Sequence, residues 1–283
     1  MVEQTKQGAK LVAGNREFST LWRPARFSGI ELLSASFTQF EFSRHWHEEL
    51  AIGVIEEGAE GLFYRGSNIV VPQRQIVAIN PSEVHTGFAG SEQGWRYRMF
   101  YFAPEMIEQH FADSDKSVDP IIDRSVIDNP ALFDLLLQLH VAFEAASLDL
   151  TKQSLLTVAF ESLFTQYGNA GRDADKVGHT QKHTGVIRDY LHDNWQDNVT
   201  LEALETVSGL TKFKLIRAFK SHYGLTPHQF LLLTKVQKAK TLLLEGHSCV
   251  ETALHCGFFD QSHFTRNFKR AFGVPPKHYA IQA

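Results

Sequence analysis

Three histidines in the first third of the chain could meet around one ligand or one metal ion. His45 and His47 lie two residues apart, and residues two apart in a β-strand face the same side. His85 follows a predicted turn and could join them from a neighbouring strand. Imidazole nitrogens can bind Zn²⁺ or Fe²⁺, line a ligand pocket, or hydrogen-bond to backbone carbonyls. The spacing leaves all three roles open.

Basic side chains near the C-terminus belong to a pattern that occurs twice. The two copies read Arg217-x-Phe219-Lys220-x3-Gly224-x2-Pro227-x2-Phe230 and Arg266-x-Phe268-Lys269-x3-Gly273-x2-Pro276-x2-Tyr279. They are offset by 49 residues throughout, whereas Gly209 and Gly257 upstream pair at an offset of 48. A repeat of this length indicates one supersecondary unit used twice.

Each copy completes a predicted helix-turn-helix unit, the first at about 199–222 and the second at about 248–271. In the first unit Thr200 can cap a helix that Gly209 ends. Thr211 can then cap a second helix, which Gly224 ends. Between the units, apolar residues at helical spacing predict one long connecting helix: Leu232, Val236, Ala239 and Leu243.

The polar face of each second helix carries the side-chain types that DNA recognition uses. Arg and Lys pair with guanine edges or phosphates, and Gln pairs with adenine. The expected contacts are Lys212, Phe213, Lys214, Ile216, Arg217 and Lys220 on the first such helix, and Gln261, Ser262, His263, Thr265, Arg266 and Lys269 on the second. The alternative is a solvated charged face, but the repeat, the turn glycines and the basic bias together favour DNA binding.

Residues 184–279 resemble the DNA-binding half of the AraC/XylS family of bacterial transcription regulators. The segment 257–269, which reads Gly-Phe-Phe-Asp-Gln-Ser-His-Phe-Thr-Arg-Asn-Phe-Lys, matches the family pattern nearly position for position. The resemblance implies two helix-turn-helix units joined by a central helix, with the recognition helices about 34 Å apart. Two positions depart from the pattern. Glu205 replaces a small alanine at the helix crossing of the first unit, and Ala280 replaces a common arginine.

The charge of the chain divides between its two halves. The net charge is −4, but residues 1–179 hold 15 Lys and Arg against 24 Asp and Glu, and residues 180–283 hold 13 against 8. The second half is therefore the half suited to phosphates. The hydrophobic content is 43%, and the N-terminus has neither the apolar core of a signal peptide nor a membrane-length apolar run behind it. We therefore expect a cytoplasmic protein, associated with the nucleoid when it is bound to DNA.

Residues 27–103 read as short strands separated by turn residues, which is typical of a sandwich or barrel. The predicted strands are 50–55, 61–64, 69–71, 76–79 and 96–102. This region resembles the cupin-type ligand-binding half of the same family. The resemblance rests on His45-Trp46-His47, on the segment 80–85, and on Trp95-Arg96-Tyr97-Arg98 with the residues that follow.

The resemblance implies a small-molecule effector pocket in this barrel. The expected effector contacts are His45, His47, His85, Tyr64, Arg65 and Trp95. Arg65 could hold an anionic group, as could Arg96 and Arg98 unless they point outward into solvent. Metal-binding cupins usually have a carboxylate four residues after the second histidine, where this chain has Ala51. We therefore expect no metal and no other cofactor. The alternative function is a metal-dependent cupin enzyme fused to a DNA-binding domain.

Two amphipathic helices should follow the barrel, at 130–146 and 151–166, joined by a short turn. They could form the seam of a homodimer or pack on their own barrel. The polar, glycine-rich segment 168–180 reads as a linker. The resulting domains are an effector-sensing cupin-like domain at 1–167, with its dimerisation helices, and a DNA-binding domain at 181–283.

The expected fold class is α+β multidomain: a cupin-like β-barrel with a helical pair, then an all-α domain of two helix-turn-helix units. The expected function is a sequence-specific DNA-binding transcription regulator under effector control, and not an enzyme. The chain has no Gly-x-Ser-x-Gly motif and no phosphate-binding glycine loop. Its expected partners are double-stranded DNA, the effector, a second copy of the chain and RNA polymerase. A third possibility is a regulator without an effector, in which the barrel only dimerises.

Overall fold

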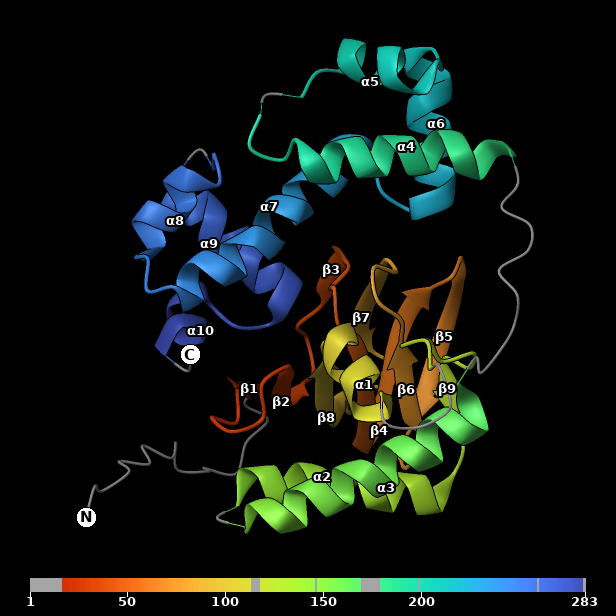
Figure 1. Cartoon of the computed structure of the whole chain (residues 1–283), viewed down its shortest axis with the longest axis vertical. Coiled ribbons are helices and arrows are strands. Elements are labelled where there is room, and N and C mark those ends of the chain that lie inside the picture. The colour runs from red at the N-terminus through yellow and green to blue at the C-terminus, as the bar shows by residue number, and fades with distance from the viewer. Residues whose placement is uncertain are drawn as a thin grey trace.

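The computed structural model describes residues 17–112, 118–145, 147–168, 179–197, 199–258 and 260–281, without the side chains of 179–182 and 213. A β-barrel with a helical pair forms the first part, and an all-α region lies at the opposite end of the barrel from that pair (Figure 1). The predicted α+β multidomain class is confirmed. None of the described helices combines the length and apolar character that a membrane span requires.

Antiparallel strands build the barrel. They are β1 (Phe18–Trp22), β2 (Ile30–Phe37), β3 (Phe42–His45), β4 (Leu50–Tyr64), β5 (Ser67–Pro72), β6 (Ile76–Ile79), β7 (His85–Ala89), β8 (Trp95–Phe102) and β9 (Val126–Ile127). The order along one side is β1-β2-β8-β4-β6-β9, while β3 pairs with β7, and β4 also pairs with β5 and β7. The strand β4 therefore belongs to both sides of the barrel.

The prediction of two separate strands at 50–55 and 61–64 is wrong, because β4 runs through both. The register shifts after Ile55, and Gly58 has a φ of +70°. A Cβ at Gly58 would lie 2.0 Å from the carbonyl oxygen of Gly94, so only glycine fits this crossing. The bulge lets the first half of β4 pair with β6 and β8, and the second half with β5 and β7.

Alternating side chains give the barrel two apolar faces. Leu33, Tyr97 and Met99 point into its interior, whereas Leu32 and Phe100, their neighbours in sequence, point outward. The outward face is covered by α2 (Pro130–Glu144) and α3 (Asp149–Tyr167), with help from α1 (Pro104–Phe111), a helix that was not predicted. The helical pair thus packs on its own barrel, which is one of the two arrangements expected from the sequence.

The all-α region contains both expected helix-turn-helix units. Its helices are α4 (His179–Asp193), α5 (Leu201–Ser208), α6 (Lys212–Tyr223), α7 (Pro227–Leu244), α8 (Cys249–His255), α9 (Gln261–Phe272) and α10 (Pro276–Ile281). The units are α5–α6 and α8–α9, and α7 is the connecting helix. The helix α4 was not predicted; Ile187 and Leu191 bury it in the same core. Most of the predicted linker, from 169 to 178, lies outside the described residues.

Glu205, which departs from the family pattern, has a structural role at the start of α6. Its carboxylate Oε1 accepts a hydrogen bond from the backbone N–H of Lys212 at 2.7 Å. Thr211 occupies the N-cap position, but its side chain makes no capping hydrogen bond. Glu205 therefore satisfies one of the free amides in the first turn of α6, a turn in which the expected cap, Thr211, makes no side-chain hydrogen bond.

We expect Glu205→Ala to destabilise the first turn of α6 by about 1 kcal/mol, the usual cost of a lost N-cap. Hydrogen exchange should show faster exchange at Lys212 and the next amides, with no change in α9. Thr211→Ala is the matched control and should leave these rates unchanged. Equal protection in both variants would contradict the capping role.

Candidate functional site

The second helix of each unit, α6 and α9, presents one apolar and one polar face. Leu215 and Phe219 of α6 are fully buried, as are Phe264 and Phe268 of α9. The predicted contacts Lys214, Arg217, Lys220, Gln261, Ser262, Arg266 and Lys269 are exposed, and Lys212, Ile216, His263 and Thr265 are half-buried. The side chain of Phe213 lies outside the described residues. The 3.6-residue period that buries the aromatic rings thus leaves the polar set on one accessible face.

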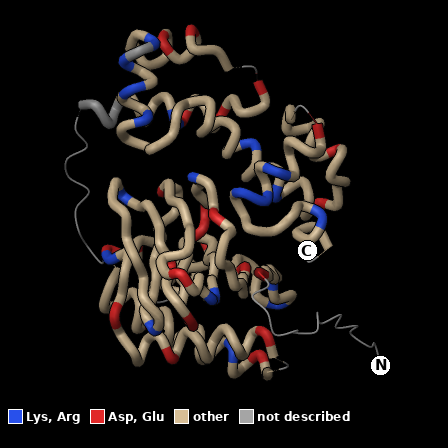
Figure 2. The backbone as a smooth tube through the Cα atoms, turned by 180° about the vertical axis from the view of Figure 1, so that it is seen from behind, with Lys and Arg blue, Asp and Glu red and all other residues tan. Residues whose placement is uncertain are grey.

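Most of the basic side chains on this face are available for a partner. Within the described part of the chain, Arg217, Lys220 and Arg266 take part in no ion pair. Lys212 differs, because its ammonium group is bound to the carboxylate of Glu202 on α5. Figure 2 shows Lys and Arg on both groups of helices, around α6 and around α7 and α9. The arrangement can offer cationic and amide groups to a long anionic partner.

The three predicted histidines meet inside the barrel. His45, His47 and His85 are 5%, 3% and 5% exposed. The ring centroid of His85 lies 4.2 Å from that of His45 and 4.8 Å from that of His47. His45 ends β3, His47 follows it, and His85 begins β7. The three rings meet because β3 pairs with β7 at His45 and His85. The expectation that they lie close together is confirmed.

The hydrogen bonds of these rings determine what they can offer to a ligand. Each Nδ1 lies 2.8–3.0 Å from a backbone carbonyl oxygen, that of Ser43, Glu49 or Glu83. A carbonyl only accepts, so each Nδ1–H donates and each Nε2 is left as an acceptor.

Burial keeps all three rings neutral. It lowers the pKa of His47 to about 4 and that of His85 to about 3, and it lowers the pKa of His45 well below its ordinary value. The Nε2 of His47 is buried and finds no hydrogen-bond partner among the described residues. In the part of the chain that the structure describes, no group of three His, Cys, Asp or Glu side chains is placed to hold a metal ion.

The other three predicted effector contacts are only partly near the histidines. Tyr64 lies across from His85, with ring centroids 6.5 Å apart, and its hydroxyl donates to the carboxylate of Glu83. Arg65 is at the barrel rim, where its Nε is 2.9 Å from the same carboxylate. Trp95 is buried among Phe37 and Tyr97, away from the cluster. Only Tyr64 extends the histidine cluster.

Arg96 and Arg98 point away from the barrel interior, which was the alternative to an anion-binding role. Arg96 pairs with Glu57 at 2.6 Å. Arg98 pairs with Glu56 at 2.9 Å and with Glu144 of α2 at 2.6 Å.

Glu60 is an interior residue that sequence reasoning missed. It is 4% exposed, and its Oε2 has no hydrogen-bond partner among the described residues. Burial raises the pKa of this carboxyl to about 8. Glu60 was not predicted to be an interior residue because a turn was expected at this position. In one continuous strand, Glu60, Leu62 and Tyr64 alternate with outward residues, and this pattern would have placed Glu60 in the barrel interior. An unpartnered buried carboxyl in an aromatic barrel is a candidate ligand contact.

The segment between β3 and β4 joins the barrel to the DNA-binding units. Trp46 stacks on Phe230 of α7, with ring centroids 5.5 Å apart and planes at 19°. The side-chain amide of Gln237 donates to the carbonyl oxygen of Trp46. His45 and His47, on either side of Trp46, point into the barrel. One short segment therefore contacts both the candidate sensing cluster and the central helix of the other part.

The C-terminal turns of both recognition helices also rest on the barrel. A guanidinium N–H of Arg44 donates to the carbonyl oxygen of Gly224, after α6, at 2.5 Å. Ser19 donates to the carbonyl oxygen of Gly273, after α9, at 3.2 Å. The ring of Phe42 lies against Gly273, so closely that a Cβ there would be 2.9 Å from it. Gly224 and Gly273 are equivalent positions of the repeat, so the barrel contacts the same feature twice.

A buried ionic cluster completes this contact. The ammonium group of Lys240, on α7, lies 2.8 Å from the carboxylate of Glu49 and 3.7 Å from that of Glu31. The hydroxyl of Tyr279 donates to Glu31 at 3.0 Å. Burial alone would lower the pKa of Lys240, but the two carboxylates outweigh it and hold this pKa well above its ordinary value. Lys240 is therefore charged and neutralised by residues of the barrel.

The buried histidines and the buried carboxyl of Glu60 predict effects of opposite sign on the pH dependence of stability. The pKa values of His47 and His85 are lowered on folding, so the unfolded chain gains protons that the folded chain does not as the pH falls from about 6.5 to 4. The contribution of these two histidines to the free energy of unfolding should fall over that range. The pKa of Glu60 is raised, so its contribution to the free energy of unfolding should fall as the pH rises from about 4.5 to 8.

Urea denaturation between pH 5 and pH 8 can isolate the contribution of Glu60. The stability of Glu60→Gln relative to the unsubstituted protein should rise steadily with pH, because the amide has no proton to lose. Glu92→Gln, at an exposed position, is the matched control. A stability difference independent of pH would show that Glu60 ionises normally in the folded protein.

Comparison with known proteins agrees with this geometry. Residues 27–160 match the family model of the AraC-like ligand binding domain, and residues 204–282 match that of a helix-turn-helix domain. An uncharacterized HTH-type transcriptional regulator of Bacillus subtilis, YbfI, is 27% identical over 224 residues, which cover 79% of this chain and 81% of that protein. The HTH-type transcriptional activator RhaS of Salmonella arizonae is 37% identical over 89 residues, 31% of this chain and 32% of RhaS.

Solved structures of ToxT from Vibrio cholerae share the fold. The unsaturated fatty acid-bound protein of strain SCE256 aligns with a TM-score of 0.54 and 14% identity, over 96% of this chain and 98% of ToxT. The ToxT of strain O395 aligns with a TM-score of 0.53 and 12% identity, over 94% of this chain and 97% of ToxT. The matches give no support to the alternative of a metal-dependent enzyme. The chain belongs to the AraC family of transcriptional regulators, with a ligand-binding domain followed by a helix-turn-helix domain.

Proposed function

We propose that this regulator reads two neighbouring stretches of the major groove through α6 and α9, under the control of a small molecule bound in the barrel. The observation that carries the proposal is the pair of accessible polar faces on two helices at equivalent positions of the repeat. The central helix α7, which joins the two units, has 18 residues and at 1.5 Å per residue is about 27 Å long. That length suits successive turns on one face of DNA.

The repeat suggests which basic residues contact bases and which contact phosphates. Arg217 and Arg266 occupy equivalent positions in the middle of the recognition helices, where a long side chain can reach a guanine edge. Lys220 and Lys269 are also equivalent and lie in the last turn of each helix, nearer the phosphates. The remaining predicted contacts would pack beside these and adjust the fit to the bases.

We assign the effector contacts to His45, His47, His85 and Tyr64, and add Glu60. The histidine Nε2 atoms are acceptors, and burial keeps Glu60 protonated at neutral pH, so it can also donate. We do not include Arg65, because its ion pair with Glu83 keeps it at the barrel rim. We do not include Trp95, because the rings of Phe37 and Tyr97 enclose it. The effector would act through Trp46, which lies between two of the histidines and packs on α7.

We also propose that the protein acts as a homodimer and that RNA polymerase is a further partner. Leu148, just before α3, is 76% exposed, and Leu150 and Val158 of α3 are 72% and 55% exposed. The helices α2 and α3 lie at the end of the barrel away from α6 and α9 (Figure 1). A second copy could cover them without blocking DNA.

The arginines and Lys220 should differ in what their loss does to DNA binding. Arg217→Ala or Arg266→Ala should weaken binding to a site selected from random DNA by about 1–3 kcal/mol and relax the preference at one base pair. Lys220→Ala should weaken binding to selected and random DNA alike and reduce the salt dependence. Fluorescence anisotropy at several salt concentrations measures both.

Arg124→Ala, at an exposed position of the ligand-binding domain, is the matched control and should bind as the unsubstituted protein does. Equal losses on selected and random DNA for all three interface variants would contradict the assignment of base contacts.

A thermal-shift screen of metabolites on the full chain tests the sensing cluster. A compound that raises the melting temperature should lose this effect in His47→Gln, and the variant should still bind the selected DNA site without the compound. Arg96→Gln, outside the barrel, should respond normally. Two results would overturn the sensing role: an unchanged response in His47→Gln, or one metal ion per purified chain that is lost on substitution of the histidines.

A further inference from the structure

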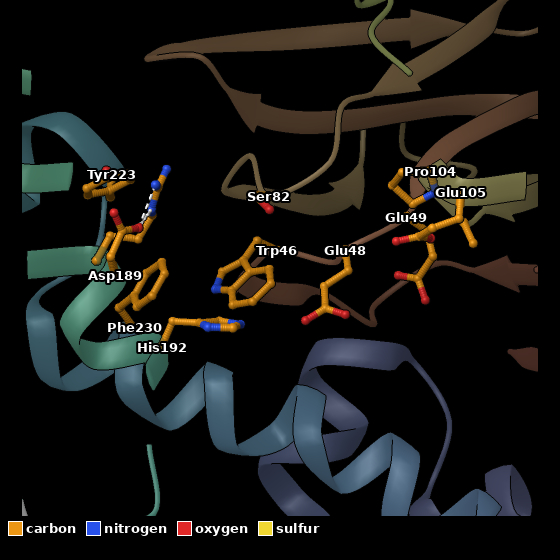
Figure 3. A pocket seen from close by; sticks show the side chains of 12 residues that line it. Trp46, Glu48, Glu49, Ser82, Pro104, Glu105, Asp189, His192, Tyr223 and Phe230 are labelled. Carbon is orange, nitrogen blue, oxygen red and sulfur yellow. Dashed lines mark hydrogen bonds and ion pairs between the residues drawn. The ribbon is translucent and has the colours of Figure 1, made fainter. Parts of the chain in front are cut away.

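A cavity lies between the rim of the barrel and the helices α4 and α7, outside the histidine cluster. Its volume is about 490 Å³, which is ample for a small organic molecule. The barrel side contributes Trp46, Glu48 and Glu105, and the helical side contributes Asp189, His192 and Phe230 (Figure 3). We call this space the interdomain cavity.

Aromatic side chains form the centre of the interdomain cavity. Trp46 lies between the two groups of lining residues in Figure 3 and is only 3% exposed. Its indole N–H finds no hydrogen-bond acceptor among the described residues, which is uncommon for a buried donor. Phe230 stacks on Trp46, and the ring centroid of Tyr223 lies 5.9 Å from that of Phe230. The faces of such rings attract cations, tryptophan most of all.

Carboxylates gather around these rings. Glu48, Glu49, Glu105 and Asp189 all line the cavity, against one lining cation, Arg188. Asp189 is paired with Arg188 at 2.6 Å, and Glu49 is paired with Lys240 at 2.8 Å. Glu48 has only a long contact with Lys238, at 3.8 Å, and Glu105 has no ion pair within the described part of the chain. Two carboxylates are therefore available to a ligand.

We propose that the interdomain cavity binds a small organic cation that carries an oxygen acceptor. Trp46 and Phe230 would contact the cationic group, Glu48 and Glu105 would neutralise it, and the oxygen would accept from the indole N–H of Trp46. An anion would meet the carboxylates without compensation, and a neutral ligand would leave them unused. This site is separate from the histidine cluster, which faces the other side of the segment 45–47.

The position of the cavity makes the bound cation a regulator of the contact between the two parts. Glu48 and Glu105 belong to the barrel part, whereas Asp189 and Phe230 belong to the helical part. A ligand that touches both sides binds best when the parts are in this arrangement, and so it stabilises the arrangement. The cation would therefore resist any separation of the barrel from the recognition helices.

Titration calorimetry on the full chain, with acetylcholine as the probe, tests this inference. Acetylcholine supplies a quaternary ammonium and a carbonyl oxygen, and 3,3-dimethylbutyl acetate is its neutral counterpart with carbon in place of nitrogen. Hexanoate is the anionic comparison. We expect acetylcholine to bind at least tenfold more tightly than the neutral ester, since tenfold corresponds to about 1.4 kcal/mol, and hexanoate not to bind.

Variants of the full chain connect that preference to the cavity. The double substitution Glu48→Gln with Glu105→Gln should weaken acetylcholine binding about five- to tenfold, as expected for two partly exposed charges. Glu108→Gln, an exposed glutamate of α1 that does not line the cavity, is the matched control. Trp46→Phe should keep part of the affinity, because a ring remains on Phe230.

Equal affinity for acetylcholine and the neutral ester would overturn the inference, as would no binding or unchanged binding in the double glutamine variant. DNA binding by these variants is measured separately, so failure of the cation site would not affect the proposed function of the recognition helices.

Discussion

Side chains in an extended segment alternate between two sides, and the segment from Arg44 to His47 has a different neighbour on each side. The rings of His45 and His47 are inside the barrel, while Trp46 packs on α7 and Arg44 holds the turn after α6. The segment cannot rotate or shift by one residue without exchanging these neighbours. Only Trp46 separates the two histidines in the sequence, and it is in direct contact with α7.

The contact between the two parts combines a continuous apolar core with a buried ionic cluster. Lys240 is neutralised by Glu31 and Glu49, which lie on the other part. A buried ionic cluster adds little net stability, because its members recover their hydration when they are exposed together. Removing one partner alone would be far more damaging, since a buried charge would remain. The ionic cluster therefore fixes the geometry of the contact, while the apolar core supplies most of its stability.

The helix-turn-helix units were predictable because glycine and proline mark their turns and because the pattern occurs twice. The helix α4 was missed because the polar, glycine-rich segment before it and its own polar N-terminal half carry no clear helical period. The strand β4 was divided wrongly because Gly58 looks like a turn residue, whereas it forms a bulge. Glu60, the ionic cluster and the interdomain cavity depend on residues that are distant in sequence, and no local pattern could have placed them together.

The barrel contacts the two recognition helices at their carbonyl ends, through Gly224 and Gly273. A helix has partial negative charge at that end and partial positive charge at its amino end. The amino ends of α6 and α9 thus point away from the barrel, whose half of the chain has a net charge of −9. A polyanion that approaches these helices would meet their attractive ends first and the repelling half of the protein last, so the fold itself orients the approach.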